Sequence, residues 1–242
     1  ELPWKENNID VVIESTGFFT ASEDAKKHIK AGAKSVIISA PTKSEDIPNV
    51  VHGVNSADGK TDVFSCASCT TNNISPVVEV LGRRIGIKKA IMTTIHAYTA
   101  SQAIVDAPSK KNFRMGRSGA NNIVPTSTGA AIATTKVLPE FKGKFDGVAL
   151  RVPIPVGSIS DLTFVTERPV TVKEINAIFE EEAATERYNN VLSTTTEPLV
   201  SSDIVKNPYA STVDLSMTRV VDGDLLKVMT WYDNEWGFTN QM

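Results

Sequence analysis

The sequence contains little cysteine and little histidine, which restricts the chemistry it can support. Only two cysteines, Cys66 and Cys69, occur among the 242 residues. Two thiols cannot build a disulfide framework. Together with three histidines they give little support for a tetrahedral zinc site. We therefore expect no bound metal.

An excess of charge of either sign is also absent. The sequence has 25 Lys and Arg residues against 28 Asp and Glu residues, and its formal net charge is -3. Proteins that bind nucleic acid or anionic membranes through charge carry basic patches instead. The composition therefore predicts neither nucleic acid nor a membrane as partner.

No long apolar run is present. The longest uncharged segment, residues 118–135, is rich in Asn, Ser, Thr, Gly and Pro, unlike a membrane-spanning helix. The first residues contain no apolar core of a signal peptide. Apolar residues make up 41% of the chain, an ordinary share for a globular protein. We expect a globular protein of the cytoplasm.

The first third of the sequence alternates between strand and helix patterns. Residues 10–15 and 35–39 are short apolar runs, typical of buried parallel strands. Between them, residues 20–31 begin like a capping box and predict a helix. This order predicts a βαβ unit. Further short strands are expected at residues 50–54 and 63–65.

After Cys69, predicted strands and helices no longer alternate regularly but occur in groups of the same kind. Helices are expected over residues 69–84, 127–138 and 171–184, and strands over residues 90–96, 148–152, 158–165, 212–217 and 225–232. Residues 98–122 show no period, and an irregular segment of this length is usually functional. The order predicts the C-terminal part of a doubly wound, Rossmann-like domain, joined to an α+β domain with a mostly antiparallel or mixed sheet.

Cys69 is the strongest candidate for chemistry. It lies where a strand-like run meets a predicted helix, and the free amides and dipole at a helix N-terminus favour a thiolate. The same amides can stabilise an oxyanion. For any single thiol the alternative is a buried structural cysteine. Cys66, three residues earlier, could serve as a redox partner.

A nucleophilic thiol needs a base, and His96 is the best placed histidine. It ends a predicted strand, and the C-terminal ends of strands are where α/β proteins build their sites; His28 lies on a predicted surface helix. Cysteine and histidine alone would equally suit a hydrolase or an acyltransferase. Arg117, Arg151 and the hydroxyl-rich helix start at Thr128 are candidate anion sites, although each could be an ordinary surface residue or cap.

Seven short segments considered together are more informative. They are Glu-Ser-Thr-Gly at 14–17, Ser-Ala-Pro at 39–41, Ala-Ser-Cys-Thr-Thr-Asn at 67–72, His-Ala-Tyr-Thr at 96–99, Ser-Thr-Gly-Ala-Ala at 127–131, Arg-Val-Pro at 151–153 and Trp-Tyr-Asp-Asn-Glu at 231–235. In this order the set resembles the phosphorylating glyceraldehyde-3-phosphate dehydrogenase family along essentially the whole chain.

The resemblance implies covalent catalysis. Cys69 would attack the aldehyde of glyceraldehyde 3-phosphate to give a thiohemiacetal, and His96 would activate the thiol and move protons. Hydride transfer to NAD or NADP would leave a thioester, which inorganic phosphate would cleave to 1,3-bisphosphoglycerate. A sister enzyme acting on erythrose 4-phosphate, or a truncated binding module without catalysis, are the alternatives.

The resemblance also implies binding sites. Thr99 and Arg151 would hold the substrate phosphate. The site for inorganic phosphate would be formed by Ser68, Thr70, Arg117, Thr128 and Gly129. Residues lining the dinucleotide would be Thr16, Gly17, Ser39 and Asn234, the last on the nicotinamide carboxamide. Residues 98–122 resemble the S-shaped loop that packs between subunits of a homotetramer.

The sequence departs from the family pattern in several places. Asn73 stands where the family often has a second cysteine, Cys66 where an asparagine is common, and Phe238 where a tyrosine is usual. No Gly-x-Gly-x-x-Gly precedes Asp10. The resemblance therefore predicts an internal fragment without the N-terminal half of the dinucleotide-binding domain, inactive alone. Its expected domains are a dinucleotide-binding remnant (1–68), a catalytic domain (69–233) and a return to the first domain (234–242).

Overall fold

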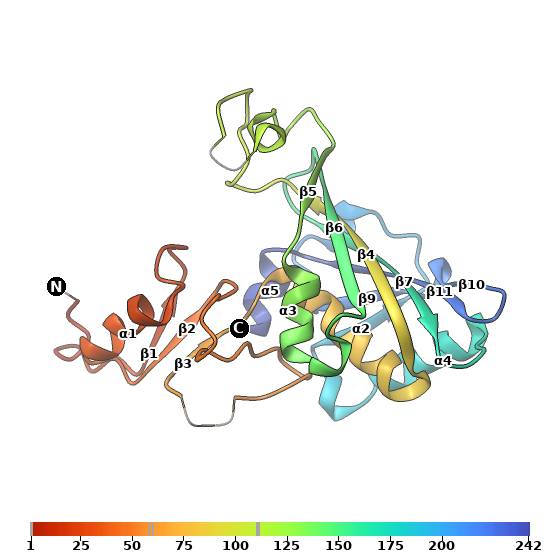
Figure 1. The fold of residues 1–242 in the computed structure, drawn as a ribbon, viewed down its shortest axis with the longest axis horizontal. Helices are drawn as coiled ribbons and strands as arrows, with labels where there is room; N and C mark the ends of the chain where they lie inside the picture. Colours follow the sequence, from red (N-terminus) through yellow and green to blue (C-terminus); the bar gives the residue numbers. More distant parts are fainter. Residues whose placement is uncertain (1, 58, 60, 110–111) are drawn as a thin grey trace.

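The described residues form two sheets of different size. The computed structural model describes residues 2–57, 59, 61–109 and 112–242. A three-stranded sheet is built from the first part of the chain, and an eight-stranded sheet from the rest. Figure 1 shows the small sheet and α1 at one end of the molecule and the large sheet, with most helices, at the other.

The small sheet contains the expected βαβ unit. Its elements are β1 (Val11–Glu14), α1 (Ser22–Lys30), β2 (Ser35–Ile38) and β3 (Val63–Ser65). The three strands are parallel in the order β1-β2-β3. Apolar side chains from all of these elements except β1 form a small buried cluster with Ile47. The prediction of a parallel, dinucleotide-binding type of sheet in this region is confirmed.

Two expectations for this region were wrong. The cap of α1 is Ala21, which offers no side-chain hydrogen bond; the amide of Ser22 donates instead to the hydroxyl of Ser44, at 3.0 Å. Residues 50–54 form no strand: a single bridge pairs Asn49 with Ser65, the amide of Val50 donates to the carbonyl of Ser65 at 2.8 Å, and the chain then turns at residues 52–54. The amide of Val51 donates to the Asn55 side chain at 2.8 Å, so a local bond takes the place of a ladder bond.

The large sheet is mixed, as the pattern predicted. Its order is β5 (Val124–Ser127), β6 (Phe145–Val152), β4 (Ile87–Ala97), β7 (Ser158–Thr166), β11 (Leu225–Tyr232), β9 (Ser211–Asp214) and β8 (Leu192–Thr195), with β10 (Arg219–Val221) beside β11. The pairs β4–β6 and β8–β9 are parallel and the other pairs antiparallel.

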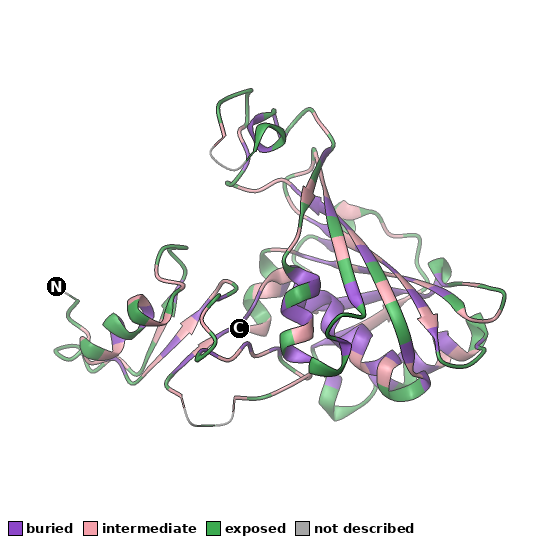
Figure 2. Cartoon of the chain, viewed as in Figure 1, coloured by how far each residue is buried: buried purple, intermediate pink, exposed green. Residues whose placement is uncertain are grey.

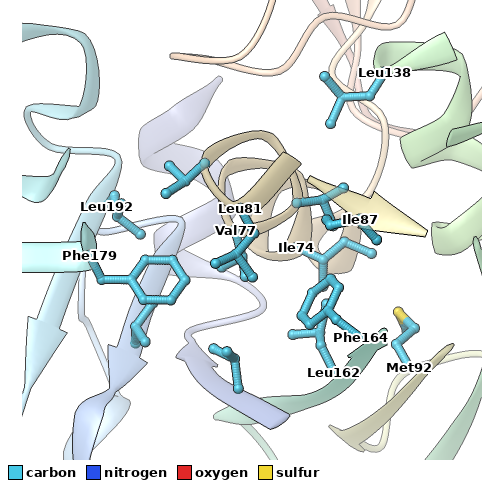
Figure 3. Packing of buried hydrophobic residues seen from close by; sticks show 14 of the residues in the cluster. Ile74, Val77, Leu81, Ile87, Met92, Leu138, Leu162, Phe164, Phe179 and Leu192 are labelled. Atoms are coloured by element: carbon cyan, nitrogen blue, oxygen red, sulfur yellow. The ribbon is translucent and has the colours of Figure 1, made fainter. Parts of the chain in front are cut away.

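Helix α2 (Cys69–Ile85) is the central element of the core. Most of its residues are buried, and Figure 2 shows buried residues on α2 and on the neighbouring strands. Its Ile74, Val77 and Leu81 lie near Leu162 and Phe164 of β7 in Figure 3. Its buried residues include the polar Thr71, Asn72 and Asn73 as well as apolar ones, so the burial is not confined to one apolar stripe. Strands and other helices therefore surround α2.

The C-terminal end of α2 is held by charge. Glu182 of α4 (Val172–Ala183) is buried and accepts hydrogen bonds from Arg83 at 2.7 Å and from Arg84 at 2.7 Å. Arg83 also pairs with Glu79 at 2.8 Å. A buried carboxylate is tolerated only when it is paired in this way. The pairs fix the position of α2 against α4.

The remaining helices follow the sequence patterns with some shifts. Thr171 caps α4, as predicted, by accepting from the amide of Glu174 at 3.2 Å. The helix expected from Ser127 begins later, as α3 (Ala130–Val137), because residues 124–127 pair with β6 as a strand. Helix α5 is Trp236–Gln241. Within the described ranges no helix has the length and apolarity to cross a membrane.

The segment that showed no period is irregular in the structure, and the strand expected over residues 212–217 is shorter than predicted. The described residues between 98 and 122 form an irregular loop, with a 3-10 turn at Phe113–Gly116, that projects from the body of the molecule in Figure 1. The strand expected over 212–217 ends at Asp214. The carboxylate of Asp214 accepts from the amide of Ser216 at 3.2 Å, which favours the 3-10 turn that follows.

We predict that replacing Phe164 by alanine destabilises the fold strongly. Phe164 is fully buried beside α2, and removing a buried phenyl ring costs about 3–5 kcal/mol of the free energy of unfolding. Urea denaturation measures this loss. The control is Val221→Ala, at a side chain 59% exposed, with an expected change within about 0.5 kcal/mol. Equal losses would contradict the packing described for α2.

Candidate active site

Cys69 and His96 meet although 27 residues separate them. Cys69 is the first residue of α2, and the cap Ser68 accepts from the amide of Thr71 at 3.1 Å. His96 lies near the end of strand β4, and its Nε2 is 3.4 Å from Sγ of Cys69. The backbone before the helix turns sharply, with Ala67 at φ 58°. The predicted thiol and base are thus in hydrogen-bond contact.

The pairing register of two neighbouring strands places Arg151 beside His96. Strands β4 and β6 are parallel, and His96 stands beside Arg151 in their ladder. Nη1 of Arg151 donates to the carbonyl of Ala97 at 2.9 Å and lies 2.5 Å from Nδ1 of His96. Its Nε is buried and has no partner in the described part of the chain. Such an unpaired donor favours an anionic ligand.

The His96 ring is neutral in this environment. Burial lowers the pKa of His96 to about 4, and the charge of Arg151 acts in the same direction. Nδ1 also lies 2.7 Å from the carbonyl oxygen of Ala97. The neutral ring has two possible tautomers. With the proton on Nδ1, that nitrogen donates to the carbonyl of Ala97, and Nε2 is free to accept from the thiol. With the proton on Nε2, Nδ1 accepts from Arg151.

The two cysteines have different surroundings. Burial raises the pKa of Cys69, but its hydrogen bond to Thr70 and the nearby Arg151 oppose this effect. Burial raises the pKa of Cys66 to about 11, and its side chain is buried whereas that of Cys69 is partly exposed. The thiolate is the reactive form of cysteine. Burial raises the pKa of both thiols, so what distinguishes Cys69 is its partial exposure and its contact with His96 at 3.4 Å.

A buried tyrosine that the sequence analysis did not single out supports the pair. The hydroxyl of Tyr232 bonds to Thr70 at 2.8 Å and to Thr94 at 2.9 Å. Its ring packs edge-on against that of His96, with centroids 5.9 Å apart. Alternate residues of β11 are buried, and Tyr232 ends that row. This alternation is the signal that could have identified it.

Asn234 is held in one orientation next to the same strand ends. Its Oδ1 accepts from the amide of Gly157 at 3.1 Å and from the hydroxyl of Ser158 at 3.0 Å. The Ser158 hydroxyl in turn accepts from the amide of Ala97 at 3.2 Å. Because Oδ1 is occupied, the amino group of Asn234 is the part of its amide left for a ligand.

The other residues expected at the dinucleotide lie together on the small sheet. Thr16 and Gly17 follow β1 directly, and Ser39 follows β2. The amide of Ser39 donates to the carbonyl of Glu14 at 3.0 Å, so these strand ends are adjacent. Parallel sheets bind nucleotides at their carboxyl edges, and Gly17, at φ 77°, lets the chain turn there. These residues fit a dinucleotide.

The residues expected to bind phosphate are less clearly grouped. The hydroxyl of Thr99 bonds to that of Ser101 at 2.9 Å. Thr99 also lines a cavity of about 440 Å³ with Glu235, next to Asn234. Arg117 instead pairs with Asp106 at 3.0 Å on the exposed loop.

The hydrogen bonds at the start of α3 are local. Thr128 accepts from the amide of Ala130 at 3.1 Å, and Gly129 caps α3. No hydrogen bond or ion pair among the described residues joins Arg117, Thr128 or Gly129 to Cys69. Within the same ranges, no three His, Cys, Asp or Glu residues form a group that could hold a metal ion.

A thiol at a helix start, in contact with a buried imidazole, is the arrangement of a thiol-dependent enzyme. Residues 68–234 match the model of the family described as "Glyceraldehyde 3-phosphate dehydrogenase, C-terminal domain". The chain is 51% identical to glyceraldehyde-3-phosphate dehydrogenase 2 of Streptomyces avermitilis, covering all of this chain and 72% of the relative. It is 52% identical to the glyceraldehyde-3-phosphate dehydrogenase of Mycobacterium tuberculosis H37Rv, again over the whole chain and 70% of the relative.

A third relative has a similar level of identity to this chain. The glyceraldehyde-3-phosphate dehydrogenase of Haloarcula vallismortis is 50% identical, covering all of this chain and 72% of the relative. The chain therefore belongs to the glyceraldehyde 3-phosphate dehydrogenase family, as the seven sequence segments indicated, and is an oxidoreductase.

We predict that His96→Asn slows alkylation of Cys69 near neutral pH. The thiol would lose the acceptor 3.4 Å away while burial continues to raise its pKa. A rise of one pKa unit lowers the thiolate fraction about tenfold below the midpoint. Iodoacetamide kinetics as a function of pH measure the shift. The control is His52→Asn, at an exposed histidine bonded to Gln241; identical profiles for His96→Asn and the wild type would contradict the contact.

Proposed function

We propose that the chain carries the chemistry of a phosphorylating glyceraldehyde-3-phosphate dehydrogenase, with Cys69 as nucleophile and His96 as base. The observation that carries the proposal is the 3.4 Å contact between Sγ and Nε2 at the start of α2. The substrate is glyceraldehyde 3-phosphate, and the product is 1,3-bisphosphoglycerate. The dinucleotide is NAD or NADP.

The first half of the reaction forms a carbon–sulfur bond. Cys69 gives its proton to Nε2 of His96 while the sulfur bonds to the aldehyde carbon. The carbonyl oxygen becomes an alkoxide, which the amides at the start of α2 stabilise, and His96 returns the proton to it. The neutral ring with its proton on Nδ1, donated to Ala97, is the form that can act as this base.

The second half oxidises and releases the substrate. His96 takes back the hydroxyl proton as a hydride leaves the same carbon, which becomes a thioester. A bound dinucleotide supplies the acceptor for that hydride. Inorganic phosphate then forms a carbon–oxygen bond as the carbon–sulfur bond breaks. The proton of the phosphate returns to the sulfur, and His96 releases one proton to solvent.

Arg151 and Thr99 hold the phosphate group of the substrate. The unpaired, buried Nε of Arg151 supports this role, since a buried guanidinium gains most from a charged partner. Ser68, Thr70, Arg117, Thr128 and Gly129 form the site for inorganic phosphate. This second assignment rests on the sequence resemblance.

The dinucleotide contacts Thr16, Gly17, Ser39 and Asn234. The adjacent strand ends of the small sheet and the fixed amide of Asn234 support this set. We assign residues 1–68 and 234–242 to the dinucleotide-binding domain and residues 69–233 to the catalytic domain.

We further propose a homotetramer of the cytoplasm that has neither nucleic acid nor a membrane as partner. The loop of residues 98–122 carries exposed apolar side chains, Ile104 at 75%, Val105 at 73% and Phe113 at 96% exposure. Exposed apolar groups gathered on one segment are typical of protein interfaces. Subunit contacts through this loop would cover them.

The nucleophile is tested by exchanging each thiol separately in the full-length protein. Cys69→Ser is expected to remove aldehyde oxidation, because a hydroxyl of ordinary pKa is a far weaker nucleophile than a thiolate. Cys66→Ser is the matched control and should keep most activity, since that thiol is buried and the contact with His96 belongs to Cys69. Turnover with glyceraldehyde 3-phosphate, and with erythrose 4-phosphate for comparison, is measured. Activity of Cys69→Ser above a few per cent would exclude the proposal.

The phosphate assignment predicts a change in specificity. Arg151→Leu should raise KM for glyceraldehyde 3-phosphate about 10- to 100-fold, the contribution of a hydrogen bond to a charged group. KM for unphosphorylated glyceraldehyde should hardly change. Arg219→Leu, at an exposed arginine bonded to backbone carbonyls, is the control. Equal effects on both aldehydes would place Arg151 outside the phosphate site.

A further inference from the structure

Glu14 is a buried carboxylate that the proposed chemistry does not use. It ends β1 and is only 3% exposed. One oxygen, Oε1, accepts from the amide of Thr16 at 2.7 Å and also from the Thr16 hydroxyl. The other, Oε2, lies 2.9 Å from Nε2 of His28. Helix α1 has an exposed face, as expected of a surface helix, but His28 lies on its buried side, at 5% exposure.

The hydrogen bonds of His28 determine which of its two ring nitrogens carries the proton. The indole nitrogen of Trp4 lies 3.0 Å from Nδ1 of His28. An indole N–H can only donate, so Nδ1 accepts and the proton of the neutral ring is on Nε2, where it is donated to Glu14. Burial alone would raise the pKa of Glu14, but the hydrogen bonds from Thr16 and His28 outweigh it and lower the pKa. Glu14 is therefore a carboxylate.

The carboxylate holds the turn that follows β1. Besides donating to Glu14, the Thr16 hydroxyl accepts from the amide of Phe18 at 3.2 Å. The backbone carbonyl of Glu14 accepts from Ser39 at 3.0 Å. One residue therefore ties together the turn around Gly17 and the end of β2. Trp4 and His28 keep that residue in place through the hydrogen bonds described above.

We propose that Glu14 is a positioning residue for the dinucleotide. The inference rests on the proposed function, in which Thr16, Gly17 and Ser39 line that ligand. Oε1 of Glu14 holds the turn in its binding shape before the dinucleotide arrives, while Oε2 is held by His28, so less ordering is needed on binding. Trp4, His28 and Glu14 form the support behind the turn.

Glutamine cannot replace this carboxylate, because the hydrogen bonds on both sides point toward it. If the new side-chain amide turned its oxygen toward Thr16, its amino group would face the N–H of His28. If it turned its oxygen toward His28, the backbone amide of Thr16 would lose its acceptor. His28 cannot move its proton to Nδ1, since Trp4 donates there. In the first orientation the buried N–H of His28 is left without an acceptor, and in the second the turn loses the hydrogen bond that holds Thr16, so both orientations disfavour the arrangement that holds the turn.

The test compares Glu14→Gln with Glu23→Gln in the full-length protein. Glu23 is an exposed residue of the same helix that carries His28, so it controls for the loss of one charge. Calorimetry with NAD and with NADP measures binding, and iodoacetamide kinetics measure the reactivity of Cys69. Glu14→Gln is expected to weaken dinucleotide binding at least about tenfold, the effect of one unpaired buried donor, and to leave alkylation of Cys69 unchanged, while Glu23→Gln changes neither.

A second comparison keeps the inference testable if Glu14→Gln folds poorly. In a Trp4→Phe background, His28 can carry its proton on Nδ1 and accept at Nε2 from the new amide. The same substitution, Glu14→Gln, should then cost less affinity than it does with Trp4 present. Such a difference is a coupling that a general loss of packing would not produce.

The outcomes separate the inference from the function on which it rests. Unchanged dinucleotide binding in Glu14→Gln, equal loss of binding and of Cys69 reactivity, or an equal cost in both Trp4 backgrounds would overturn the role of Glu14. Failure of the wild-type protein to bind either dinucleotide would instead overturn the proposed function.

Discussion

The attachment of the first turn of α2 to the strand ends is the constraint on which the site depends. Thr70 is bonded to Tyr232 at 2.8 Å. One turn further, Asn73 donates to the carbonyl of Ala210 and to the hydroxyl of Thr230, both at 3.2 Å. Buried polar groups that are satisfied across elements specify a single arrangement. These bonds keep Cys69 within 3.4 Å of His96.

Buried polar groups also hold the residues expected to contact the dinucleotide. Ser158 connects the backbone of Ala97, next to His96, to Asn234. On the small sheet, Glu14 connects the turn at Thr16 to His28. Each network ends at the carboxyl edge of a strand. Apolar packing places the strands, and these polar bonds then set the orientation of the side chains at their ends.

Residues whose local pattern agrees with their environment were predictable. Strand β11 was expected over the residues it occupies, because its alternate residues face the core. Thr171 caps α4 because its hydroxyl reaches an amide three residues away. By contrast, the cap of α1 depends on Ser44, 22 residues distant, and residues 124–127 became a strand only because β6 lies beside them. Distant partners leave no local signal.

The sequence by itself determined the order of elements, the family and the identity of the candidate thiol and base, since motifs and periodicity are local properties of the chain. Only the tertiary structure decided that His96 stands beside Arg151, that Tyr232 supports both segments of the site, and that Glu14 and His28 form a buried pair. It also decided that Arg117 bonds to Asp106. The physical reason is that burial and strand register, which join residues far apart in the chain, set these contacts and protonation states.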